Sequence, residues 1–298
     1  MRVVFLLLTN SATVPNHFYP PMRRCIYCGE TKLPAGVNRF GDEHIIPLAI
    51  GGSLVLPEAS CRACERIINQ QIETPVLSQE WGYLRSKREF PTRNKKKRKT
   101  HVIVRRHDGS TMKVPVGDYP SPVPLYKFGE PRILTGLPFG TDHLRWTMEI
   151  LGDHDSEAEM RKRHPDWNGH HVLRAQPYPF ARLLAKIAYG YVVAEWGLGG
   201  FDPLGLDIIL GRSDDYFYTV GGSWDIAQPI AGGDHVTDII LRFLNPDRLQ
   251  ILVNIRLFSK VRMPSYVVVV GNIDLQNPQH LVTFAKHRED GKIPKISI

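Results

Sequence analysis

Two stretches of the sequence decide the fold: FGDEHIIPLAIGG at residues 40–52 and CRACERIINQQIE at residues 61–73. The first joins an acidic residue and a histidine to a short apolar segment, a proline and a Gly-Gly pair. This order predicts a strand, a bend and a loop. The second has helical spacing, because Ile68 and Ile72 lie four residues apart and share one face of a helix. The region therefore predicts strand, loop and helix in succession.

The four cysteines of the chain form two pairs of identical spacing, Cys25 with Cys28 and Cys61 with Cys64. Two CxxC pairs supply the ligands of a tetrahedral zinc site, in which each sulfur binds at about 2.3 Å. A disulfide-rich secreted domain would be smaller and denser in cysteine, and a redox CxxC needs only one pair. The alternative is four unrelated thiols. The spacing favours a structural zinc site, which by itself says nothing about catalysis.

Together these elements resemble an HNH endonuclease domain, of the His-metal finger (ββα-metal) superfamily, that carries a four-cysteine zinc ribbon. The shared pattern is CxxC, an acidic-His-Ile-Ile-Pro-Leu segment, a Gly-Gly turn, and a second CxxC that opens a helix. The resemblance runs from Cys25 to about Glu73, about one-sixth of the chain. It implies metal-dependent hydrolysis of phosphodiester bonds, with DNA as the expected substrate because most of the family cuts DNA. No residue identified in the sequence excludes RNA.

The resemblance also implies roles for individual side chains. His44 is the expected general base, because a neutral imidazole with an ordinary pKa of about 6.5 can take a proton from water. Glu43 and Glu65 are the expected ligands of a catalytic Mg²⁺ or Mn²⁺ ion, which prefers hard oxygen donors. Asp42 is an alternative to Glu43 as a ligand. Asn69, one helical turn beyond Glu65, is a candidate for the distal polar group of the motif.

The sequence also departs from the family pattern. Most members carry Asn or His where this chain has Glu65, and the Asn that often anchors the central loop has no clear counterpart in residues 53–60. These departures keep open an alternative function, a non-catalytic zinc-stabilised protein that binds nucleic acid. In that interpretation His44 is vestigial.

The net charge of +8 is concentrated in one short segment, residues 85–99, which holds nine Lys and Arg residues against Glu89 alone. Such a segment is expected to be a solvated connector that binds phosphates without reading sequence. The alternative is a solvated linker with no specific contact. The residues predicted to bind nucleic acid are Arg93, Lys95, Lys96, Lys97, Arg98 and Lys99.

The length of 298 residues predicts more than one domain. We expect an N-terminal zinc-bound ββα-metal domain at 1–84, a basic linker at 85–100 and a larger mixed α+β domain at 101–298. The fold class is thus α+β. The C-terminal domain has no catalytic motif, so it is expected to select substrate, bind a protein partner, or sense a ligand that gates the nuclease. The sequence leaves the oligomeric state open.

Within that C-terminal part, the pattern predicts a hairpin around residues 107–110, a helix at 180–196 and strands at 250–258 and 266–270. The proline-rich stretch 119–140 is expected to be irregular.

The overall composition is that of an ordinary globular protein. Hydrophobic residues make up 42% and charged residues 23%, which excludes wholesale disorder, collagen and coiled coil. The apolar run from Val3 to Leu8 is far shorter than the roughly 20 residues of a membrane span, and short for a signal-peptide core. It predicts a buried strand. We therefore expect a soluble, cytoplasmic protein with no membrane partner.

Overall fold

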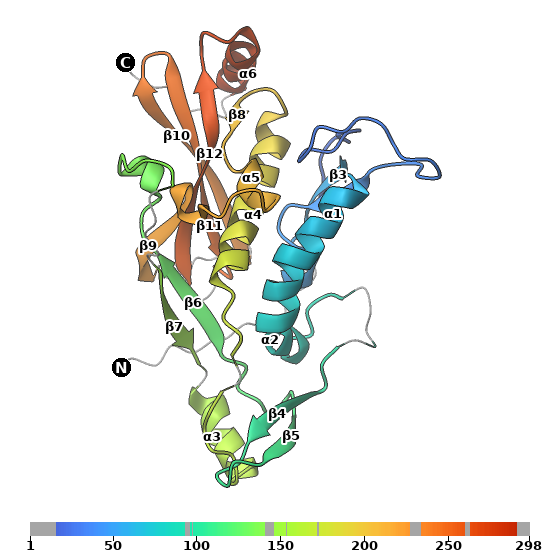
Figure 1. Ribbon diagram of the computed structural model, residues 1–298, viewed down its shortest axis with the longest axis vertical. Helices are drawn as coiled ribbons and strands as arrows, with labels where there is room; N and C mark the ends of the chain where they lie inside the picture. Colours follow the sequence, from blue (N-terminus) through green and yellow to red (C-terminus); the bar gives the residue numbers. More distant parts are fainter. Residues whose placement is uncertain are drawn as a thin grey trace.

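The computed structural model describes residues 16–92, 96, 98–140, 146–152, 154–171, 173–226, 234–259 and 263–290 (Figure 1). The strand predicted at residues 3–8 lies outside these ranges. Helices and strands are mixed along the chain, as the predicted α+β class requires. Among the described residues, no helix combines the length and the apolar character needed to cross a membrane.

The N-terminal part is the predicted ββα arrangement. Its three-stranded sheet has the order β1-β3-β2, with β2 antiparallel to β3 and His44 opposite Val55. The chain then continues through three consecutive helical segments, which we call the helical column. The elements are β1 (His17–Phe18), β2 (Gly41–His44), η1 (Leu48–Ile50), β3 (Leu54–Ser60), and, in the helical column, α1 (Arg62–Ile68), η2 (Asn69–Glu80) and α2 (Gly82–Lys87).

The Gly-Gly turn between β2 and β3 has a clear steric basis. Gly51 adopts a φ of +90°, a left-handed conformation that residues with a Cβ rarely take. Gly52 passes so close to the preceding chain that a Cβ there would lie 2.0 Å from the carbonyl oxygen of Ile46. Both glycines are therefore required for the chain to reverse between the two strands.

The C-terminal part centres on a five-stranded sheet, in which β10, β11, β12 and β8 follow in order and β9 also pairs with β12. In Figure 1 the paired strands β6 and β7 lie next to β9 of this sheet, and a hairpin of β4 and β5 and the helix α3 lie at the far end of the molecule. The hairpin strands are β4 (His101–Arg105), β5 (Thr111–Pro115), β6 (Val123–Phe128) and β7 (Trp146–Leu151), and the helix is α3 (His154–Arg163). The sheet strands are β8 (Asp202–Pro203), β9 (Val220–Ile226), β10 (His235–Asn245), β11 (Arg248–Leu257) and β12 (Pro264–Asp274). The short helices are η4 (Arg132–Leu134), α5 (Leu206–Ile209), η5 (Tyr216–Tyr218) and α6 (Pro278–Glu289).

Helix α4 (Pro177–Trp196) links the two parts. It begins with a proline at its first position and ends at Gly197, which has a φ of +82°. Figure 1 shows α4 between the five-stranded sheet and the helical column. Fifteen of its twenty residues are buried, in agreement with a helix that is covered on both sides.

One hydrophobic core runs through both parts of the molecule. The same cluster of buried side chains contains Ile45 and Ile72 from the N-terminal part, Phe180 and Ile187 from α4, and Val253 from the five-stranded sheet. A second, smaller cluster lies under the β4–β5 hairpin around Trp167. The predicted domain boundaries at 84 and 100 remain a prediction, but the ββα segment and α4 share their packing.

Candidate functional site

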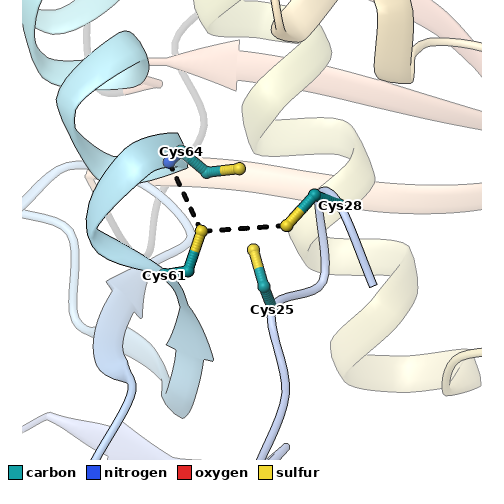
Figure 2. A group of neighbouring side chains, drawn as sticks. All are labelled: Cys25, Cys28, Cys61 and Cys64. Atoms are coloured by element: carbon teal, nitrogen blue, oxygen red, sulfur yellow. Dashed lines mark hydrogen bonds between the residues drawn. The ribbon is translucent and has the colours of Figure 1, made fainter. Parts of the chain in front are cut away.

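The four cysteines converge at the start of α1 (Figure 2). Their sulfur atoms all lie within 4.8 Å of one another, and the Sγ atoms of Cys28 and Cys61 are 3.7 Å apart. A tetrahedron with metal–sulfur arms of 2.3 Å has edges of about 3.8 Å, so this separation is the one that a bound zinc ion requires. The cysteines therefore form a group able to hold a zinc ion.

Local structure explains how the two CxxC pairs meet. Cys61 is the N-cap of α1, and the backbone N–H of Cys64 donates to its sulfur at 3.5 Å. Although burial opposes ionisation, this contact and the neighbouring thiols lower the pKa of Cys61. Burial raises the pKa of Cys25 to about 11. Four sulfur donors fill every position of a tetrahedral ion and leave none for a substrate, so the group fits a structural metal.

A separate cleft of about 280 Å³ lies between strand β2 and the helical column. It contains all three side chains to which the resemblance assigned catalytic roles, together with both alternatives. The polar side chains that line it are Asp42, Glu43, His44, Glu65, Asn69, Glu73, Thr74, Ser78, Arg85 and Thr92. The structure therefore brings the predicted site residues together in one place.

His44 and Glu43 occupy the end of β2, and a lysine from α4 contacts both residues. The Nζ atom of Lys186 lies 2.6 Å from Oε1 of Glu43 and donates to the backbone carbonyl of His44 at 2.6 Å. It also lies 3.1 Å from Oε1 of Glu73. Lys186 is 0% exposed, and Glu43 is also buried. The ion pair thus fixes the strand end that carries the predicted base.

The charges of this group depend on one another. Burial raises the pKa of Glu43, and the nearby Lys186 opposes that rise. Burial disfavours the ammonium of Lys186, but Glu43 and Glu73 together raise its pKa, so it carries a full positive charge. The phenol of Tyr27 has its pKa raised by burial and by Glu43. The wall of the cleft behind Glu43 is therefore an ion network that is buried at Lys186 and Glu43 and partly exposed at Glu73.

Glu65 lies on α1 across from the start of β2. A Cβ placed on Gly41 would be 3.5 Å from Oε2 of Glu65, which locates this exposed carboxylate beside the strand. Among the described residues, the four cysteines form the only group of three or more His, Cys, Asp or Glu side chains whose ligand atoms all lie within 4.8 Å of one another. Glu43, His44 and Glu65 thus line the cleft without forming a compact ligand cluster.

Asp42, the alternative ligand, is held by other parts of the chain. Its Oδ2 pairs with Arg39 at 2.9 Å, and its Oδ1 accepts from the backbone N–H of Glu58 at 3.2 Å. Both carboxylate oxygens therefore have protein partners.

The far wall of the cleft is a π-helix, η2, in which backbone bonds run from i to i+5. In this geometry, residues four to five apart share a face. Asn69, Glu73, Thr74 and Ser78 follow that spacing and all line the cleft. Thr74 donates its hydroxyl to the Asn69 side chain at 3.3 Å. The unusual helix thus presents an extended row of polar groups.

The basic segment is only partly a solvated connector. Arg98 donates to the carbonyl of Phe90 at 2.9 Å, and the Nζ atom of Lys99 lies 4.3 Å from the ring centre of Tyr83. Lys96 is exposed. Arg93, Lys95 and Lys97 lie outside the described residues. The expectation of a uniformly solvated run is therefore wrong for Arg98 and Lys99, because carbonyl and aromatic partners are within reach.

Three residues of the site were not identified from the sequence as site residues. Arg85, counted there only among the basic residues, donates to the carbonyls of Ala49, Leu77 and Pro91 at 2.7, 2.8 and 3.4 Å. Glu73 and Lys186 were not singled out at all. The one available signal was the position of Lys186 among apolar residues, between Ala185 and Ile187 in a predicted helix, because a buried lysine needs acidic partners.

The comparisons with known proteins agree with this geometry. Residues 25–80 match the family model described as HNH endonuclease, so this segment is an HNH domain, as the resemblance predicted. No curated protein and no solved structure matches the chain. An HNH domain supports a nuclease-type function in general and implies a nucleic-acid substrate. The matched segment contains the four cysteines, strand β2 and both α1 and η2.

Proposed function

We propose that this protein is a metal-dependent HNH endonuclease that hydrolyses phosphodiester bonds in DNA. The observation that carries the proposal is the cleft, in which His44, Glu43 and Glu65 lie together inside the HNH segment. The four-cysteine group supports the same segment by joining the loop of Cys25 to the start of α1. Hydrolysis needs an activated water and compensation of charge on the leaving oxygen, and these residue types serve those needs.

His44 is the group that takes the proton of the attacking water. It is half-buried in the wall of the cleft, where substrate and water have access, and its backbone is held by Lys186. Hydroxide then attacks phosphorus as the bond to the leaving oxygen breaks. A general base of this kind accelerates reactions by about 10²–10⁴-fold. The leaving oxygen takes up a proton from solvent water, and the proton that His44 accepted returns to solvent, so the base is restored after each turnover.

The donor set of the cleft fits a hard divalent cation. Glu65 and Glu43 offer carboxylate oxygens, with Asn69 adjacent, and such oxygens suit Mg²⁺ or Mn²⁺. Bound there, the cation supplies charge neutralisation at the leaving oxygen. The charge of the cleft supports this requirement. Four carboxylates, those of Asp42, Glu43, Glu65 and Glu73, line the cleft. They outnumber the cations described beside them, which are Arg85, Lys186 and Arg39, so a phosphate would be repelled without a further cation.

The basic segment supports binding to a polyanion. Pro91 and Thr92, which lead into residues 93–99, line the same cleft. The lysine and arginine side chains that follow Thr92 in the sequence would neutralise phosphates on either side of the scissile bond and release counterions. Binding should therefore weaken steeply as salt increases.

A second candidate function rests on one specific observation. Glu43 is buried and paired with Lys186 rather than open to solvent, and Glu65 replaces the usual family residue. Both features would suit a zinc-stabilised protein that binds nucleic acid without cutting it.

Cleavage of supercoiled plasmid by the full-length, zinc-loaded protein separates the two candidates. We expect cutting in Mg²⁺ or Mn²⁺ and none in EDTA, with a matched RNA transcript as the second substrate. Binding of the plasmid without cutting in either metal would support the binding protein. Cutting of the RNA alone would support the nuclease function but show that its substrate is RNA and not DNA.

A further inference from the structure

Lys186 is a fully buried lysine in the core of the described structure. Among the described residues, its ammonium contacts three oxygen atoms, one for each of its protons: Oε1 of Glu43, Oε1 of Glu73 and the carbonyl of His44. Two of the three partners sit on β2 and the third on η2. A single atom from α4 thus joins the two walls of the cleft.

Stability alone does not explain this arrangement. Removing an ammonium and a carboxylate from water costs several kcal/mol per ion, and well-packed apolar side chains of similar size often stabilise a protein as well or better. Its neighbours Ala185 and Ile187 are apolar and buried, so an apolar side chain at position 186 would continue the same core. What the ion network provides is a defined position for the atoms that it contacts.

Those atoms belong to the proposed chemistry. The His44 carbonyl fixes the backbone that carries the general base, and Glu43 is a proposed ligand of the divalent ion. Glu43 and Glu73 are like charges that contact one ammonium, which offsets their repulsion. Without Lys186 the two carboxylates would repel each other, and the end of β2 would lose its anchor to α4.

We infer that Lys186 is a positioning residue of the cleft, through which the C-terminal part of the chain completes the HNH site. The inference rests on the proposed nuclease function. Lys186 does not contact substrate, because it is fully buried. It acts through Glu43 and His44, as residues behind metal ligands generally do, and loss of such partners typically costs 10–100-fold in metal affinity or activity.

Helix α4 offers a matched control in Arg182, one helical turn before Lys186. Arg182 is also buried, and its guanidinium donates to the side chain of Gln71 at 3.0 Å and to the carbonyl of Ile209 at 2.9 Å. Like Lys186, it joins α4 to η2 through a buried cation. Its hydrogen-bond partners, however, do not line the cleft. Replacing each cation by methionine removes a similar charge from a similar environment.

The test compares wild type, Lys186→Met, Lys186→Arg and Arg182→Met as full-length, zinc-loaded proteins. We expect Lys186→Met to lower kcat for plasmid cleavage by about 10–100-fold with little change in KM, and to weaken Mn²⁺ affinity, measured by calorimetry, by about tenfold. Arg182→Met should keep both kcat and Mn²⁺ affinity within about threefold, even if it melts earlier. Equal kcat losses in the two methionine variants, or unchanged Mn²⁺ affinity in Lys186→Met, would overturn the inference.

The remaining outcomes are also decisive. If Lys186→Met fails to fold, Lys186→Arg retains the charge but displaces the donors, and we expect a folded protein with reduced kcat and weaker Mn²⁺ binding. Wild-type values in that variant would overturn the positioning role. If wild type itself cuts no substrate in either metal, the proposed function fails. The Mn²⁺ affinities then still report whether Lys186 positions the cleft.

Discussion

The imidazole Nε2 of His235, on β10, lies 2.8 Å from the backbone carbonyl of Ile50, in the loop between β2 and β3. The other ring nitrogen, Nδ1, lies 3.3 Å from the amide of Phe258, which can only donate, so Nε2 carries the proton and donates to Ile50. Tyr189 on α4 makes a similar link by donating to the carbonyl of Ile26 at 2.5 Å. The loops of the HNH segment are thus tied to the C-terminal part.

From these links we expect that residues 1–100 alone do not form a stable fold. The fragment would expose Ile72, Val76 and Trp81, which are buried in the shared core. Circular dichroism, zinc content and plasmid cleavage of the fragment check this. A folded, zinc-loaded fragment that cuts DNA, beside an inactive full-length protein, would instead support a C-terminal sensor that gates the nuclease.

Cys61→Ala should lose the bound zinc and unfold the start of α1, because the binding energy of a structural zinc site is part of the folding energy. Cys61 contributes both a sulfur and the N-cap of the helix. Metal content by mass spectrometry and thermal unfolding measure the effect. Ser110→Ala serves as the control, because Ser110 is exposed and lies far from the cysteines in the sequence. Retention of zinc and activity in Cys61→Ala would contradict a four-cysteine site.

His44→Ala should leave zinc content and thermal unfolding close to wild type while lowering kcat by about 10²–10⁴-fold, the range for loss of a general base. The contact from Lys186 is to the backbone of His44, so it survives the substitution. Initial rates of plasmid nicking give kcat. Loss of zinc in this variant would show that His44 has a structural role.

Glu65→Ala should raise the Mg²⁺ concentration needed for half-maximal cleavage by about tenfold or more, because one oxygen ligand is lost. Glu65→Asn should restore part of the activity, since asparagine also offers an oxygen and is common at this position in the resembled family. Glu159→Gln, an exposed carboxylate on α3, is the control. An unchanged metal requirement in Glu65→Ala would remove Glu65 from the site.

Glu80 should make folding stability depend on pH. Burial raises its pKa from 4.5 to about 7, although it accepts hydrogen bonds from the Tyr126 hydroxyl at 2.5 Å and the Gln176 amide at 2.7 Å. The folded protein therefore holds this proton more tightly than the unfolded chain does. The stabilisation is complete below pH 4.5 and is lost as the pH rises to about 7.

The expected loss across that interval is about 3 kcal/mol of unfolding free energy, at 1.36 kcal/mol per pKa unit. Glu80→Gln keeps an oxygen that can accept both hydrogen bonds but has no proton to lose, so its stability should not show this decline. Denaturant unfolding of both proteins at pH 5 and pH 8 measures the difference. Parallel pH profiles for the two proteins would show that Glu80 does not titrate in this range.

The sequence predicted those parts of the molecule whose signals are local. The strand, Gly-Gly turn and helix of the HNH segment follow from short-range spacing, as does α4 from the period of its apolar residues. The prediction of an irregular stretch at 119–140 was wrong in part, because β6 (Val123–Phe128) lies within it. Pro124 is tolerated there because β6 belongs to a two-stranded sheet and so has a free edge.

The same distinction applies to the site. His44, Glu43 and Glu65 were identified because they lie within one short pattern. Lys186 could not be identified, because it meets His44 from 142 residues away along the chain and only the packing of α4 brings them together. Glu73 was missed for the same reason, since its partner is also Lys186.

The π-helical form of η2 decides which side chains a substrate meets. At the 100° per residue of an α-helix, Thr74 and Ser78 would point about 140° and 180° away from Asn69. In η2 all three line the cleft. Deleting one residue between Asn69 and Glu80 would favour a return to ordinary α-helical winding and would turn part of this row out of the cleft. The zinc site, β2 and Glu65 precede the deletion, so we expect the substrate preference of the proposed nuclease to change more than its chemistry.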